Sequence, residues 1–129
     1  MVYQYHEPTR KKVSAGTGGR KRKFRDKKLA HMGGGFTATK VNAEEDRYVK
    51  RGRGGTTKVK ARRAGFVNVL MDGKKTKKAK IISVVESHNP QYARQNIITR
   101  GAILNTDVGK VRVTNRVGQD GMVNGILIK

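Results

Sequence analysis

The sequence predicts an all-β protein: a small, barrel-like domain of six or seven strands, preceded by a basic, extended N-terminal tail. Three observations support this prediction. From residue 48 onward, short runs rich in valine and isoleucine alternate with turn-forming residues. Before residue 46, aliphatic residues are scarce and glycine, lysine and arginine are frequent. A chain of 129 residues has room for one small core and a tail. We therefore expect a tail over residues 1–45 and a body over residues 46–129.

The expected tail has too few apolar side chains to fold by itself. Glycines at positions 16, 18 and 19 and at 33–35 lie on both sides of a basic run over residues 20–28. Such a segment cannot bury enough apolar surface to offset the entropy of ordering. We expect it to be disordered in the free protein and to become ordered between RNA helices. The alternative is an unstructured tail that only improves solubility.

The body begins with two alternating runs, within residues 47–63, that flank glycines at 52, 54 and 55. In the second run, Val59 and Ala61 would point to one strand face and Lys58, Lys60 and Arg62 to the other. The first face can pack against a core, and the second is cationic. The glycines allow a bulky ligand to approach the backbone. This layout is typical of a β surface that lies on phosphates, but an edge strand protected by lysines would look the same.

The remaining elements follow in order along the chain. Residues 66–71 predict a strand, and Asp72-Gly73 predicts a hairpin turn. Residues 74–80 would be the exposed, basic start of a return strand that is buried over residues 81–85. Pro90 ends this strand, because proline cannot donate to the ladder, and residues 91–95 can form one helical turn.

The last third of the chain predicts further short strands. Residues 97–99 and 102–104 are strand-like, and residues 109–117 alternate. In that stretch Val111 and Val113 share one face, and Lys110, Arg112 and Arg116 share the other. Residues 118–121 would form a turn before a closing strand over residues 122–128.

The charge of the chain points to a polyanionic partner. Thirty lysines and arginines against nine acids give a formal net charge of +21 and a pI near 11.0. The sequence has no apolar run of the ~20 residues that a membrane span requires, so nucleic acid is favoured over membrane. There is no cysteine and no signal-peptide pattern, and we expect a cytoplasmic protein.

The sequence contains no recognisable catalytic, cofactor or metal motif. His6, His31 and His88 are isolated from one another, and no glycine-rich loop matches a nucleotide-binding pattern. We therefore expect no enzyme activity, cofactor, metal or small-molecule substrate. The scarcity of aromatic residues favours contacts with the RNA backbone over base stacking. The candidate RNA-binding residues are cations of the tail and of the strand faces: Arg10, Lys11, Lys12, Arg20, Lys21, Arg22, Lys23, Arg25, Lys27, Lys28, Arg51, Arg53, Lys58, Lys60, Arg62, Arg63, Lys74, Lys75, Lys77, Lys78, Arg94, Arg100, Arg112 and Arg116.

Three motifs resemble a known family. Residues 89–102 read NPQYARQNIITRGA, residues 118–125 read GQDGMVNG, and residues 53–58 read RGGTTK. Together with Gly18-Gly19-Arg20, they resemble the "eight-e" ribosomal proteins of archaeal and eukaryotic small subunits. The short length resembles the archaeal form.

The resemblance implies a structural protein of the small ribosomal subunit, with a barrel-like body and a tail that threads through ribosomal RNA. Its implied partners are small-subunit ribosomal RNA and neighbouring ribosomal proteins, and it would support translation in the cytoplasm. Two alternatives stay open at this point. One is an RNA-modifying or assembly enzyme that uses a similar surface, and the other is a non-specific polyanion binder of the chromatin type.

Overall fold

The computed structural model describes residues 16, 18–19, 31–71 and 75–128. The chain divides into two compact units, Met1–Phe36 and Thr37–Lys129, which are described separately. In the first unit, the described side chains of Met32 and Phe36 are exposed. The basic run of residues 20–28 and the Asp72-Gly73 turn lie outside the described residues, so their expected conformations stay predictions. Residues 37–45, assigned to the tail from the sequence, lie in the second unit.

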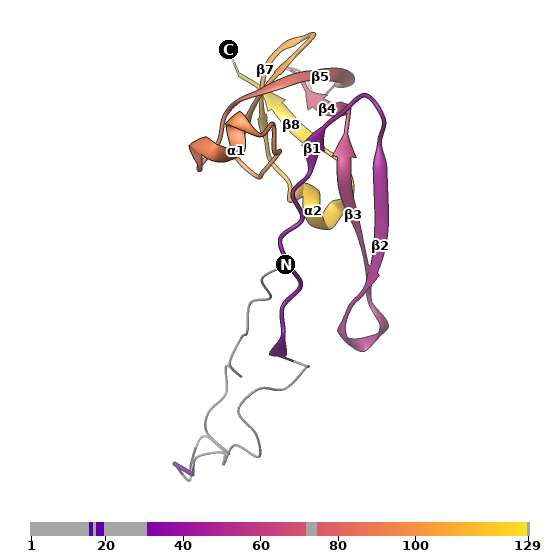
Figure 1. Cartoon of the computed structure of the whole chain (residues 1–129), viewed down its shortest axis with the longest axis vertical. Coiled ribbons are helices and arrows are strands. Elements are labelled where there is room, and N and C mark those ends of the chain that lie inside the picture. The colour runs from indigo at the N-terminus through magenta and orange to yellow at the C-terminus, as the bar shows by residue number, and fades with distance from the viewer. Residues whose placement is uncertain (1–15, 17, 20–30, 72–74, 129) are drawn as a thin grey trace. The chain divides into compact units, whose positions relative to one another are not determined.

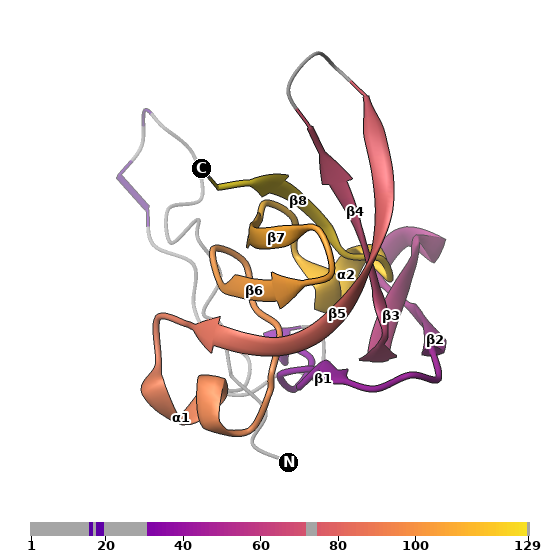
Figure 2. The same ribbon diagram turned by 90° about the horizontal axis from the view of Figure 1, so that it is seen from above.

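The second unit contains a closed five-stranded barrel (Figures 1 and 2). Its strands are β4 (Phe66–Leu70), β5 (Thr76–Glu86), β6 (Ile103–Thr106), β7 (Gly109–Val113) and β8 (Asn124–Leu127). Consecutive strands pair antiparallel, and β8 closes the barrel by pairing parallel to β4. Closure leaves no unpaired barrel edge. The predicted all-β, barrel-like fold is confirmed.

A three-stranded sheet precedes the barrel in the chain. It consists of β1 (Lys40–Val41), β2 (Asp46–Arg51) and β3 (Thr57–Ala64), in the order β1-β3-β2. A single 3-10 turn, η2 (Arg53–Gly55), lies in the loop between β2 and β3. Strand β1 runs parallel to β3, whereas β2 and β3 form an antiparallel hairpin that projects beyond the barrel (Figure 1).

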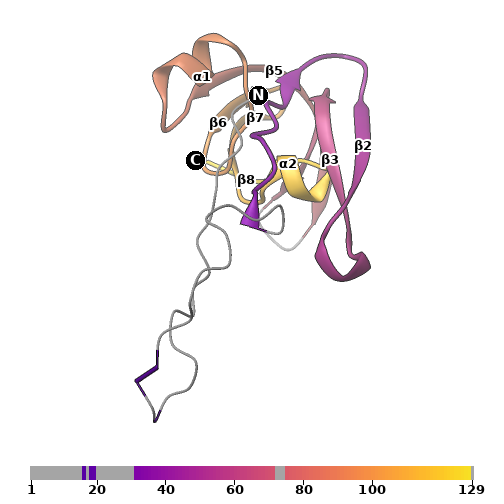
Figure 3. The same ribbon diagram turned by 60° about the horizontal axis from the view of Figure 1, so that its bottom comes forward.

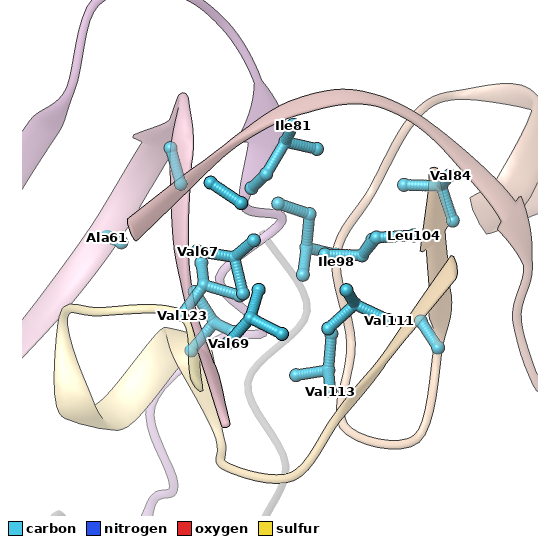
Figure 4. Packing of buried hydrophobic residues seen from close by; sticks show 14 residues of the cluster. Ala61, Val67, Val69, Ile81, Val84, Ile98, Leu104, Val111, Val113 and Val123 are labelled. Carbon is cyan, nitrogen blue, oxygen red and sulfur yellow. The ribbon is translucent and has the colours of Figure 1, made fainter. Parts of the chain in front are cut away.

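Small aliphatic side chains fill the interior of the barrel. Leu104, Val67, Val69, Val111 and Val113 are at most 1% exposed, and Figure 4 shows these side chains converging from opposite walls. They come from alternating positions of β4, β6 and β7, as the period of a strand requires. Ala61 of β3 joins the same cluster, which ties the three-stranded sheet to the barrel.

Two short helices lie outside the barrel wall. Asn89 caps the N-terminus of helix α1 (Pro90–Arg94): its side chain accepts a hydrogen bond from the backbone N–H of Gln91. Its position agrees with the helical turn predicted over residues 91–95. Figure 3 shows α1 beside β5 and α2 (Val117–Asp120) beside β3.

The prediction of one continuous strand over residues 109–117 and a turn over residues 118–121 is wrong. Strand β7 ends at Val113, and Val117 instead begins α2 with its side chain 2% exposed. The backbone N–H groups of Gln119 and Asp120 donate to the carbonyl of Arg116. Gly121 ends the helix at a φ of 72°, a conformation that glycine adopts without a steric penalty.

The strand predicted over residues 97–99 is also wrong, although these residues are buried. Asn96 has a φ of 52°, and Ile97 turns back so that its N–H donates to the carbonyl of Tyr92 at 2.8 Å. Ile97 makes only an isolated bridge with Lys40. The N–H of Ile98 donates to the carbonyl of Thr39. This apolar run therefore plugs the space between α1 and β1 rather than joining a sheet.

Gly125 of β8 tests the closure of the barrel. A Cβ atom here would collide with Cγ1 of Val111 and lie 2.8 Å from the carbonyl oxygen of Arg112. We expect Gly125→Ala to lower the free energy of unfolding by about 1–3 kcal/mol, as overpacking does in other cores. The matched control is Gly16→Ala, since no atom lies within 4 Å of a Cβ built at Gly16. Equal urea midpoints for the two variants would contradict the close packing of β8 on β7.

A second prediction concerns the start of the second unit at Thr37. Thr39 is fully buried and its hydroxyl donates to the carbonyl of Ala61 at 2.6 Å. A fragment of residues 37–129 should therefore unfold in one cooperative thermal transition with β-type circular dichroism. A fragment that starts at residue 47 lacks β1 and Thr39, so it should melt at a lower temperature. Identical melting of both fragments would show that residues 37–46 add nothing to the fold.

Candidate nucleic-acid interface

The surface of the second unit carries positive charge that is almost uncompensated. Within the described part of the chain, the single ion pair between a basic and an acidic side chain joins Nη2 of Arg47 to Oε2 of Glu45 at 2.7 Å. Lys60 is partly buried, whereas the other described lysines and arginines are exposed. Without nearby carboxylates, these cations repel one another unless an anion lies between them.

The β2–β3 hairpin gathers several cations on one side. Because directly paired residues share a face, Lys50 lies opposite Lys58 and Tyr48 lies opposite Lys60. Arg62 falls on the same side, since it follows Lys60 by two positions. We call this set, Tyr48, Lys50, Lys58, Lys60 and Arg62, the hairpin face. Like charges directly opposite each other are unfavourable in a free sheet, so the hairpin face is suited to a bound polyanion.

Neighbouring groups position the side chains of the hairpin face. The guanidinium of Arg62 lies 4.4 Å from the centre of the Tyr48 ring. Nζ of Lys60 donates to Oγ1 of Thr37 at 3.2 Å, and Nζ of Lys58 donates to Oε1 of Gln119 at 3.3 Å. All these partners are neutral and leave the positive charges in place. These contacts therefore position the side chains of Lys58, Lys60 and Arg62 without placing an acid beside them.

The opposite side of the hairpin holds Val49, Val59 and Ala61 together with Arg47 and Arg51. Less of its apolar part is buried than the sequence predicts. Ala61 is 1% exposed, as expected, whereas Val59 is 40% exposed. Val59 pairs with Val49, which is 65% exposed. Only the end of β3 near the barrel reaches the core. In the loop between the strands, Gly54 and Gly55 have φ values of 71° and 77°, a conformation that glycine adopts without a steric penalty.

A second group of cations lies on β5. Lys75, just before β5, and Lys77 and Lys78 within it are exposed, as predicted for the start of this strand. Lys80 is exposed as well, although the candidate RNA-binding residues did not include it. Nζ of Lys78 lies 4.3 Å from the centre of the Phe66 ring.

The other predicted residues are dispersed. Arg51 ends β2, Arg63 lies near the end of β3, Arg94 is in α1, Arg100 precedes β6, Arg112 is in β7 and Arg116 precedes α2. Sequence reasoning also missed Lys50, whose pairing with Lys58 requires a register that the sequence does not reveal. The remaining predicted residues, or their side chains, lie outside the described part: Arg10, Lys11, Lys12, Arg20, Lys21, Arg22, Lys23, Arg25, Lys27, Lys28, Arg53 and Lys74.

A small hollow of about 110 Å³ opens beside β4. Its lining combines the exposed side chains of Phe66 and Met122 with the cations Arg47, Arg63 and Lys78. It thus joins residues of β2 and β3 to the barrel wall. The described residues contain no group of three acids or histidines placed to hold a metal. Among the helices of the described part, none is long and apolar enough to cross a membrane.

Comparison with known proteins gives a consistent result. A family model for ribosomal protein S8e matches residues 8–128. The chain is 47% identical to the small ribosomal subunit protein eS8 of Sulfurisphaera tokodaii, over 88% of this chain and 90% of the relative. Similar identities relate it to proteins of the same name from Pyrobaculum calidifontis, at 48% over 88% of each chain, and Staphylothermus marinus, at 45% over 88% and 90%.

The hairpin face predicts how RNA affinity responds to salt. Replacing Lys58, Lys60 and Arg62 together with glutamine should leave the fold intact, because none of the three contributes to the buried core. If each binds a phosphate, the slope of log K against log salt should decrease by roughly 2–3.

The matched control for this variant removes three charges from three different strands, at Lys40, Lys80 and Lys110. Its slope should change less, because these residues do not share one face. Equal changes in both variants would mean that the hairpin face has no special role, as in the edge-strand alternative.

Proposed function

This chain belongs to the ribosomal protein S8e family, and we propose that it is a structural constituent of the small ribosomal subunit that binds and stabilises the subunit's ribosomal RNA. The S8e family is a structural, non-enzymatic one, so the expectation that the chain is not an enzyme agrees with its family. The proposed partners are small-subunit ribosomal RNA and neighbouring ribosomal proteins, and the proposed location is the cytoplasmic ribosome. Its role in translation would be to hold RNA in place.

The observation that carries the RNA-binding role is the hairpin face. Strand β3 presents three cations at alternate positions, Lys50 adds a fourth from β2, and the polar contacts of their side chains are to neutral groups. A strand advances about 3.3 Å per residue, so neighbouring cations of β3 are spaced about 6.6 Å apart. This spacing is close to the separation of successive phosphates along an RNA strand, so one strand of RNA could engage several of them. Release of condensed counterions would drive this binding.

The tail supplies the second part of the proposal. Residues 1–36 carry ten lysines and arginines and two acids, for a net charge of +8. A segment with this charge and so few aliphatic residues gains order mainly when RNA phosphates surround it. In the proposed mechanism the barrel is a rigid body that docks on RNA, and the tail binds further RNA segments and holds them together.

Co-sedimentation tests the proposed function directly. In native extracts of the source cells, the protein should occur in one copy per small subunit and remain there after a wash in moderate salt. A protein that exchanges freely between DNA and RNA would instead support the alternative of a non-specific polyanion binder. That outcome would contradict the proposal.

The tail makes a prediction of its own. During reconstitution of small subunits, a fragment of residues 37–129 should compete poorly with the full-length chain, because it lacks the +8 charge of residues 1–36. The measurement is the ratio of the two proteins in purified subunits after mixing them in equal amounts. A full-length chain in which the ten tail cations are replaced with glutamine is the control for length. Equal incorporation of fragment and full-length chain would refute a role for the tail.

A further inference from the structure

We propose that the hollow beside β4 binds one unpaired nucleotide of an RNA strand, with the base inside and the phosphate at the basic rim. The inference deepens the proposed RNA-binding function and rests on it. It adds to the hairpin face, which reads only charge, a site that distinguishes an extruded base from a paired one.

The size of the hollow suits part of a nucleotide. Its volume is about 110 Å³, and a closed cavity of about 150 Å³ holds a benzene ring. The hollow is open to solvent on one side, so a pyrimidine ring can enter while its ribose stays outside. The lining also includes Ala64, Gly121 and Val123, all of which are buried.

Apolar side chains that are exposed at the hollow provide surfaces for a base. The side chains of Phe66 and Met122 are 37% and 47% exposed. An unstacked base commonly stacks on an aromatic side chain, and methionine sulfur makes favourable contacts with aromatic rings. Phe66 is also the one phenylalanine of the described part that belongs to the barrel wall.

Polar groups in the lining match the edge of a base. Nδ2 of Asn68 donates to Oδ1 of Asn124 at 3.1 Å, which fixes the Asn68 amide. Within the described part of the chain, Oδ1 of Asn68 accepts no hydrogen bond, so it can accept one from a base. Glu45 also lines the hollow and offers carboxylate oxygens. Two acceptors favour a base that presents an exocyclic amino group, such as cytosine.

The rim supplies cations for the phosphate. Arg47, Arg63 and Lys78 come from three different strands and all line the hollow. Glu45 orients the Arg47 guanidinium through the 2.7 Å ion pair, and Lys78 is placed over the Phe66 ring. An arginine can bind a phosphate through two parallel hydrogen bonds. The lining thus combines base stacking, base hydrogen bonding and phosphate binding.

The test is a titration of the ¹⁵N-labelled full-length chain with cytidine 5′-monophosphate, followed by amide and side-chain chemical shifts. Shifts should concentrate at Asn68 and residues 121–123 and should saturate. Inorganic phosphate, the matched probe without a base, should not reproduce them. Phe66→Leu keeps an apolar side chain and removes the ring, so it should raise the dissociation constant about fivefold or more. Lys110→Gln removes an exposed cation of β7 outside the hollow, and it should leave the dissociation constant unchanged.

The other outcomes separate this inference from the proposed function. Identical shifts with inorganic phosphate, or an unchanged dissociation constant for a folded Phe66→Leu variant, would overturn the nucleotide site. Dispersed shifts that do not saturate would overturn it as well. In each of these cases salt-dependent binding to ribosomal RNA would leave the proposed function standing. If the wild-type chain bound no ribosomal RNA at all, both the nucleotide site and the proposed function would be overturned.

Discussion

Mutual repulsion of positive charges is the constraint on which the rest of this structure depends. A net charge of +21 in 129 residues opposes any compact arrangement of the chain. The fold meets this constraint by separating the two kinds of side chain. Valine, alanine, isoleucine and leucine fill a closed barrel, and nearly all described cations lie outside it in contact with water. The core is small, so the charge that stays on the surface is tolerated best when an RNA supplies the counter-charge.

Much of the fold could be predicted from the sequence because strand periodicity is a local property. The alternation of Val111 and Val113 with Lys110 and Arg112 marks a strand with one buried face, and the structure confirms it. Residues 97–99 could not be interpreted in this way. A short apolar run is buried equally well in a strand or in a plug, and the positive φ of Asn96 decides between them. Residues 117–120 form a helix because tertiary packing buries Val117, a contact invisible in the local pattern.

The positive charge of the candidate site could be predicted from the sequence, but which residues lie next to one another could not. The cations of β3 are visible as an alternating pattern, so the charge of the hairpin face follows from the sequence. The position of Lys50 opposite Lys58 depends on strand register, which a sequence fixes only through its whole set of contacts. The hollow brings Arg47, Arg63 and Phe66 together with residues 121–123, more than fifty positions further along the chain. No local motif could indicate that combination of an aromatic ring, an amide and three cations.

The parallel pairing of β4 with β8 has a consequence for the time at which the protein can fold during its synthesis. This pairing joins Asn68 to Asn124, so the barrel cannot close until the residues of β8 have left the translating ribosome. Contacts of such long sequence separation also make folding slow, since the loop between them must be closed first. The N-terminal residues emerge long before that moment. A nascent chain of this protein thus exposes its basic N-terminal residues while its barrel is still open, and RNA is the partner most able to engage them then.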